Sequence, residues 1–147
     1  MSKNNVTEND YVKFEANGVA MPSYGANLQI NLHTADPGET GVATTNEPTY
    51  TAYVAQTVPR DSTGLTICDG TVPYAANPNG PGYKNTALVS FPEYEGGFVG
   101  TETITHSSVS VIATGQILRR AALSAPRIYA AGATPQFLPG TMIYVED

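Results

Sequence analysis

Tryptophan is absent from this chain of 147 residues, and cysteine and histidine are scarce. The single cysteine, Cys68, cannot form a disulfide within the chain, and a chain of this length buries enough apolar surface to fold without one. With only His33 and His106 beside it, Cys68 cannot complete a familiar zinc site, which takes three or four ligands. The sequence therefore predicts no metal site and no cofactor.

Charge is also scarce, above all positive charge. Charged residues make up 14% of the chain, and seven Lys and Arg stand against thirteen Asp and Glu, for a net charge of -6. Phosphate groups and anionic membrane surfaces attract clustered Lys and Arg, so we expect neither nucleic-acid nor membrane binding. A sparsely charged surface suits a protein covered by partners, and it equally suits a β-domain faced with Thr, Ser and Asn.

Long apolar runs are missing as well. The first residues lack the apolar stretch of a signal peptide, and no run approaches the ~18 apolar residues of a membrane span. We therefore expect synthesis in the cytoplasm of the cell.

Motifs that carry catalysis are not found either. The chain has no Gly-x-Ser-x-Gly elbow and no glycine-rich phosphate or dinucleotide motif. Asp36 and Glu39 lie in a glycine-containing turn but lack the ordered Asp and Asn ladder of a calcium loop. We predict that the chain is not an enzyme; a small hydrolase is the reading that this inventory supports least.

The chain is rich in glycine (14 residues), proline (11 residues) and threonine, which suits short strands joined by many turns. We predict an all-β fold, an antiparallel β-sandwich or jelly-roll-like barrel of about eight strands, in one domain over residues 25–147. The expected strands cover residues 27–33, 50–58, 65–68, 86–91, 101–113, 116–123, 127–129 and 141–146.

Apolar and polar residues alternate without a break from Leu28 to His33. Successive side chains of a strand point to opposite faces, so the apolar set should be buried and the polar set exposed. The expected buried residues are Leu28, Ile30 and Leu32, and the expected exposed residues are Gln29, Asn31 and His33.

A tight turn at Thr114-Gly115 predicts that the flanking strands pair as a hairpin, with Pro126 ending the second strand. Arg119 and Arg120 lie on that strand and form the only adjacent pair of basic residues in the chain. Because neighbouring side chains point to opposite faces, at least one of them should find a carboxylate, in this chain or in a partner.

Residues 1–24 differ from the rest and predict a short helix capped by Thr7 and ended by Asn17-Gly18, or else an extended arm. In the helix, Tyr11 and Phe14 would share the inner face. Nine tyrosines are present, and we expect a long surface loop over residues 73–85 that carries Tyr74 and Tyr83. These tyrosines either anchor the loop or bind a neighbouring subunit or a glycan. The candidate partner-binding residues are Tyr11, Phe14, Tyr74, Tyr83, Arg119 and Arg120.

Several stretches at turns and strand edges form a recognisable series. They are LHTADPGE (32–39), VPR (58–60), GQIL (115–118), LSAP (123–126) and PQFLPG (135–140). In this order they resemble a family of small virion proteins of tailed phages and prophages, often labelled phage tail fiber proteins. The resemblance covers roughly residues 25–146, and Arg119-Arg120 stands where smaller or neutral residues are expected. It implies a place in the virion, without deciding between head and tail.

Compact size, low charge and a distinct arm suit a capsid decoration or cement protein better than a long, repetitive fibre. Such a protein would bind the major capsid protein, stabilise the head shell and form a homo-oligomer within the virion. The alternative is a tail or fibre-associated receptor-binding module that is bound to tail proteins and contacts host glycan through residues 73–85.

Overall fold

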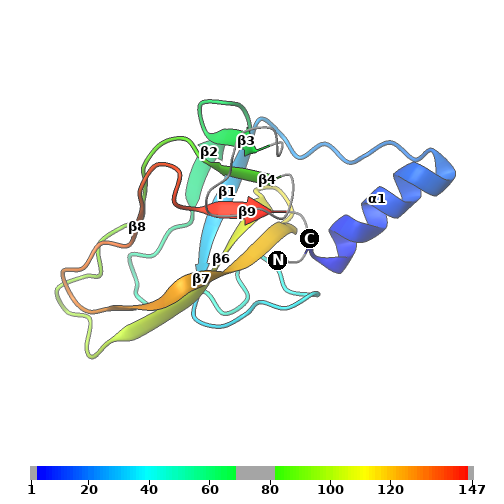
Figure 1. The fold of residues 1–147 in the computed structure, drawn as a ribbon. Helices are drawn as coiled ribbons and strands as arrows, with labels where there is room; N and C mark the ends of the chain where they lie inside the picture. Colours follow the sequence, from blue (N-terminus) through cyan, green and yellow to red (C-terminus); the bar gives the residue numbers. More distant parts are fainter. Residues whose placement is uncertain (1–2, 69–81, 146–147) are drawn as a thin grey trace.

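The computed structural model describes residues 3–68 and 82–145, which form one helix and nine short or medium strands. The strands pair in antiparallel sheets, which confirms the predicted all-β class with an N-terminal helix (Figure 1). The largest sheet has the order β2-β1-β6-β7, a second has the order β3-β4-β9, and β5 pairs with β8. The strands are β1 (Asn27–His33), β2 (Gln56–Pro59), β3 (Leu65–Cys68), β4 (Gly82–Asn85), β5 (Val89–Ser90), β6 (Glu102–Val111), β7 (Ile117–Tyr129), β8 (Gln136–Phe137) and β9 (Ile143–Val145).

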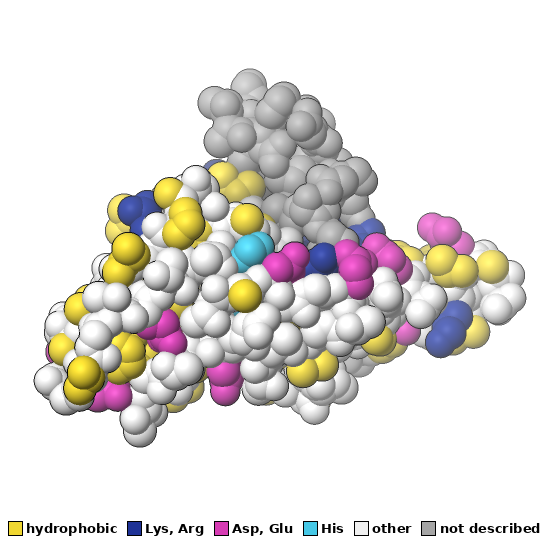
Figure 2. All heavy atoms as spheres, turned by 90° about the horizontal axis from the view of Figure 1, so that it is seen from below, with side chains coloured by type: hydrophobic (Ala, Val, Ile, Leu, Met, Phe, Trp, Pro, Cys, Tyr) yellow, Lys and Arg dark blue, Asp and Glu magenta, His cyan; other side chains and the backbone are white. Residues whose placement is uncertain are grey.

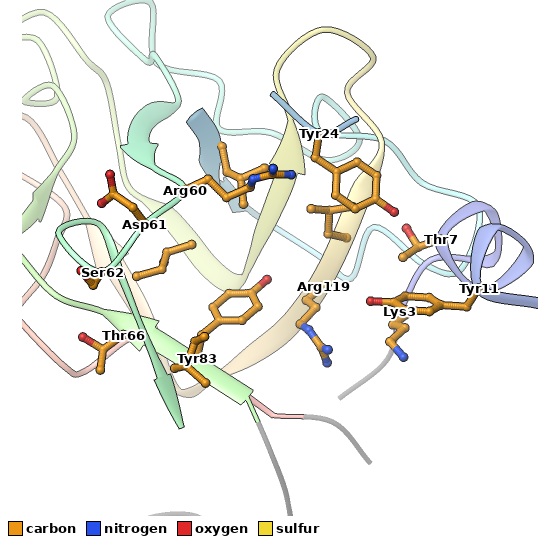
Figure 3. A pocket seen from close by; sticks show the side chains of 14 residues that line it. Lys3, Thr7, Tyr11, Tyr24, Arg60, Asp61, Ser62, Thr66, Tyr83 and Arg119 are labelled. Carbon is orange, nitrogen blue, oxygen red and sulfur yellow. The ribbon is translucent and has the colours of Figure 1, made fainter. Parts of the chain in front are cut away.

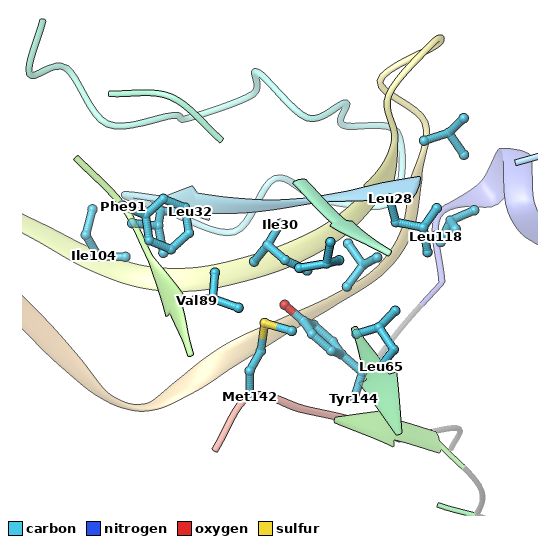
Figure 4. Packing of buried hydrophobic residues seen from close by; sticks show 13 residues of the cluster. Leu28, Ile30, Leu32, Leu65, Val89, Phe91, Ile104, Leu118, Met142 and Tyr144 are labelled. Carbon is cyan, nitrogen blue, oxygen red and sulfur yellow. The ribbon is translucent and has the colours of Figure 1, made fainter. Parts of the chain in front are cut away.

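The core lies between the four-stranded sheet and the smaller sheets (Figure 4). Leu28, Ile30 and Leu32 of β1 are buried there, as their alternation predicts. From the other side come Tyr144 of β9 and Met142 just before it. The two sides of the core are joined by a hydrogen bond as well, because the Tyr144 hydroxyl donates to Ser107 Oγ of β6 at 2.7 Å.

The outer face of β1 is buried too, so the prediction that Asn31 and His33 are exposed was wrong. The segment after β1 folds back over this face, and the Thr45 carbonyl lies 2.7 Å from His33 Nδ1. A carbonyl only accepts, so Nδ1 carries the proton, and Nε2 accepts from Ser108 Oγ at 2.7 Å. Asn31 Nδ2 donates to Ser108 Oγ and to Ser110 Oγ. These bonds satisfy the buried polar groups.

The hairpin of β6 and β7 forms as predicted, with Gly115 at φ 69° in its turn. The strand does not end at Pro126, however, and runs on to Tyr129. Ile104 pairs with Arg127 and His106 with Ala122, so residues 123–126 bulge out opposite Thr105. Proline is tolerated here because a bulge on the edge strand of a sheet needs no ladder N–H from it.

Four of the expected strands are shorter in the structure. The strand expected over residues 101–113 covers only Glu102–Val111, and the strand expected from residue 50 begins only at Gln56. The reason lies in Tyr50, which turns inward and stacks on Tyr94 with ring centroids 3.8 Å apart. The Glu95 carboxylate accepts hydrogen bonds from the N–H groups of Thr51 and Ala52, which holds this segment as a turn. The strands expected over residues 86–91 and 141–146 likewise shrink to β5 and β9.

The N-terminal segment forms a helix, α1 (Asn5–Asn17), rather than an extended arm, and it projects from the β-body (Figure 1). Asn4, not Thr7, is its cap, and its side chain accepts a hydrogen bond from Val6 N at 2.9 Å. Gly18 ends the helix with φ 63°, as predicted. Among the described residues, no helix has both the length and the apolar character needed to cross a membrane.

Candidate partner-binding site

The first turns of α1 are tied to the β-body by hydrogen bonds. Asn4 Nδ2 donates to the Gly41 carbonyl at 2.7 Å, and Asn5 N donates to the Glu39 carbonyl at 3.0 Å. Thr7, which was expected to cap the helix, is buried instead, and its Oγ1 donates to the Ile117 carbonyl at 2.9 Å. The helix is therefore rooted at its beginning, whereas residues 11–17 are all exposed.

Arg120 reinforces this root from β7. Its Nε lies 2.9 Å from Asp36 Oδ1 and its Nη2 lies 2.6 Å from Glu39 Oε1. Its Nη1 also donates to the Lys3 carbonyl. Hydrogen bonds from the Gly38 N–H and from the Arg120 guanidinium hold the pKa of Asp36 below its ordinary value. The expectation that one arginine finds a carboxylate is thus met within the chain, and the Arg120 side chain serves the fold.

A pocket of about 440 Å³ opens beside the root of α1 (Figure 3). It brings together three of the residues selected from the sequence, namely Tyr11 of α1, Tyr83 of β4 and Arg119 of β7. Tyr83 was expected in a surface loop, which was wrong: it lies in β4 opposite Ile67 of β3. A pocket of this size with mostly apolar walls and a few polar groups is typical of a binding site.

The floor of this pocket is apolar and its rim carries cations. Leu28, Leu65 and Leu118 are buried at the floor, whereas Ile67 at the rim is 78% exposed. The Arg119 guanidinium lies 5.6 Å from the Tyr83 ring centroid, within the range of a cation–π contact. Lys3 Nζ lies 4.5 Å from the ring centroid of Tyr11 in the same way.

Tyr24 is the unusual member of the pocket lining. Its hydroxyl oxygen is buried and has no hydrogen-bond partner among the described residues. Burial raises the pKa of this phenol above its ordinary value, so the hydroxyl keeps its proton. A buried donor without a partner costs free energy unless another group reaches it.

The abundance of tyrosine has a structural explanation elsewhere. Tyr50, Tyr94 and Tyr129 stack in sequence, and Tyr53 packs edge-on against Tyr50 and stacks with Phe91. The Tyr94 hydroxyl donates to Glu102 Oε2 at 2.7 Å. These rings anchor loops to the core, so the tyrosine count by itself does not mark a contact surface.

The chain matches one protein family almost from end to end. Residues 2–144 match the family described as Podophage GP4 fiber I protein gp80. The chain belongs to this fiber I family. No curated protein matches the sequence. The match confirms the resemblance to small tailed-phage proteins of the fiber type and shows a structural phage protein.

Two further candidate residues of this fiber I family member, Phe14 and Arg120, do not line the pocket. Phe14 is on the exposed part of α1, and Tyr74 falls outside the described residues. The pocket residues Tyr24 and Arg60 were missed because no local pattern marks them. They reach the pocket through the packing of segments that are distant in sequence.

The structure assembles no metal cluster from the residues it describes. No group of three His, Cys, Asp or Glu side chains within that part of the chain is placed to hold an ion. His33 is buried in the network described above, and His106 Nδ1 lies 2.8 Å from Thr105 Oγ1. Cys68 ends β3, and its side chain falls outside the part that is described.

Proposed function

We propose that this chain is a non-enzymatic structural subunit of a tailed-phage virion, built into a fibre-type appendage. The observation that carries this proposal is the match to the fiber I family over residues 2–144. The match spans both α1 and the β-body, so the proposal applies to the whole described chain.

The structure supports a building role in two ways. Side chains on both faces of β1 are buried, so the β-body is well packed, as suits a structural subunit. The helix α1 stands out from that body with exposed apolar side chains, as expected of a segment that contacts a neighbour. The pocket at its root offers a second contact surface.

A capsid decoration protein is the second candidate. It is favoured by the compact β-body and by a sequence without internal repeats, whereas fibres are often long and repetitive. In this role the chain would bind the major capsid protein and stabilise the head shell by many modest contacts multiplied by symmetry.

Locating the protein on the particle separates these roles. An epitope inserted between Gly96 and Gly97 lies in an exposed turn that borders open space, apart from α1 and from the pocket lining. Gold label at the tail supports the fibre role, label spread over the head supports decoration, and purified virions without label or chain contradict both. Particles that carry the untagged chain are the control for label specificity.

Cryo-microscopy of the same particles should reveal density that fits the β-body with its projecting helix. Binding of the purified chain to a glycan array would add receptor recognition to the structural role. A chain that binds no glycan while lying at the tail would be a structural fibre subunit only.

A further inference from the structure

Half of α1 is left uncovered by its own chain. Val12 and Phe14 are 59% and 52% exposed, and Val19 just beyond the helix is 51% exposed. Figure 2 shows hydrophobic, acidic and basic side chains together on this projecting end of the molecule. A single helix of 13 residues has little stability of its own in water, so an outer half without packing gains from a partner.

The apolar side chains of α1 are not confined to one face. By helical geometry, Phe14 follows Thr7 and Tyr11 along the side that meets the β-body, whereas Val12 points to another side. A helix that is apolar on more than one side is buried by surrounding surfaces rather than by one flat face. A groove or pocket is therefore the kind of surface that fits it.

The pocket beside the α1 root offers such a surface. Its floor of buried leucines and its exposed rim residue Ile67 supply apolar contacts. Central apolar pockets of this kind hold the anchor side chains of protein interfaces.

The charges of helix and pocket are complementary. The helix carries three carboxylates, Glu8, Asp10 and Glu15, against one ammonium group, Lys13. The described pocket lining carries Lys3, Arg60 and Arg119 against Asp61. Lys3 and Arg119 also contact tyrosine rings of their own chain, and Arg60 stands at the rim beside Tyr24 in Figure 3. Over its whole length the helix is net acidic because of Glu8 and Asp10, whereas Lys13 offsets Glu15 within the outer half, so the attraction to this rim comes from the helix as a whole.

We propose that the outer half of α1 docks in the pocket of a second copy of this chain. The two surfaces differ, so the contact is heterologous: each copy gives one helix and offers one pocket. Such contacts close into rings or continue as filaments. The inference names a neighbour for the structural subunit proposed above, but its test uses the purified chain and does not depend on the place in the virion.

Sedimentation velocity of the full chain, up to about 100 µM, measures this association directly. We expect the wild-type chain to self-associate, and Phe14→Ser in the helix and Ile67→Glu at the pocket rim each to weaken association about tenfold or more. Val99→Ser is the matched control, since Val99 is 93% exposed but lies away from both surfaces, and it should associate like wild type. All three positions are exposed, so far-UV circular dichroism should remain unchanged.

A mixing experiment tests the heterologous geometry. Phe14→Ser keeps an intact pocket and Ile67→Glu keeps an intact helix, so an equimolar mixture should form a complex that neither variant forms alone, and it should stop at two chains. Raised salt should weaken it, because the attraction is partly between charges.

Two outcomes overturn the proposal. One is a wild-type chain that stays monomeric over the whole concentration range. The proposal fails in that case even if α1 binds a different virion protein. The other is an Ile67→Glu chain that associates like wild type while Phe14→Ser does not, which indicates direct pairing of helices. Either result leaves the virion role intact, and a failed localisation on the particle leaves the self-association intact.

Discussion

Nη2 of Arg120 lies 2.6 Å from Oε1 of Glu39, and the backbone carbonyl of the same Glu39 accepts from the first N–H of α1. One side chain on β7 thereby positions the short segment on which the helix stands. The direction in which α1 projects depends on an ion pair in the β-body as well as on the helix itself.

Replacing this arginine should therefore loosen the helix root. We expect Arg120→Met to lower the free energy of unfolding by about 1–2 kcal/mol, since Arg120 is buried but its two carboxylate partners are half-exposed. Urea unfolding followed by circular dichroism measures the change. Arg127→Met removes an exposed guanidinium from the same strand and should be close to neutral. Equal losses in both variants would contradict the role of the pair.

The helix cap offers a finer test, because Asn4 uses both ends of its amide. Its oxygen accepts from Val6 N, and its nitrogen donates to the Gly41 carbonyl. Asn4→Ala should cost about 1–2 kcal/mol and reduce helical signal. Asn4→Ser keeps a capping oxygen and loses the amide donor without adding a charge, so it should retain the helix while lowering stability. If Asn4→Ser melted α1 as fully as Asn4→Ala, capping would not be the reason.

Two tyrosines allow a comparison of how much a bonded and an unbonded hydroxyl contribute to the free energy of unfolding. The Tyr53 hydroxyl accepts from Leu32 N at 2.9 Å, beyond the point where β2 stops pairing with β1. Tyr53→Phe should cost about 1–2 kcal/mol, because the Leu32 N–H is then buried without an acceptor. Tyr24→Phe removes a buried hydroxyl that has no partner among the described residues, so stability should stay the same or rise by up to about 1 kcal/mol. Thermal or urea unfolding of both variants decides between these expectations.

Buried His33 predicts a pH dependence. Burial lowers its pKa from 6.5 to about 4, because the charged ring is poorly solvated there. Between these pH values His33 binds a proton in the unfolded chain but not in the folded chain. The free energy of unfolding is therefore highest above pH 6.5 and declines as the pH falls toward 4. From pH 7 to pH 5 this group should remove about 2 kcal/mol.

The measurement is urea unfolding at several pH values between 5 and 7, where most carboxylates remain ionised. His33→Gln should lower stability at neutral pH and flatten the dependence. His106→Gln, which removes the other histidine, should keep the slope. An unchanged slope in His33→Gln would assign the effect to other groups.

The β-class, the apolar face of β1 and the β6–β7 hairpin could be predicted because they follow from local pattern. Alternation places Leu28, Ile30 and Leu32 on one face whatever the rest of the chain does. It does not tell what covers the opposite face. The burial of Asn31 and His33 depends on the return of the segment around Thr45, which distant contacts such as the stacking of Tyr50 on Tyr94 hold in place.

The helix cap and the pocket also depend on contacts between residues that are distant in sequence. Asn4 and Thr7 are both good capping residues, so the local sequence does not decide between them. In the structure Asn4 also donates to the distant Gly41 carbonyl, and the helix begins at Asn5. Tyr11, Tyr83 and Arg119 were selected one by one for their residue type. Their meeting in one pocket needs the packing of α1, β4 and β7, which no spacing in the sequence reveals.

The bulge at residues 123–126 affects the tendency of the chain to aggregate. β7 is an edge strand of the largest sheet, and a long flat edge invites other chains to add strands until insoluble aggregates grow. The bulge breaks the regular spacing of that edge, and Pro126 within it lacks the N–H that a new strand would need. The bulge thus hinders the addition of further strands, and with it aggregation, along this stretch of the edge.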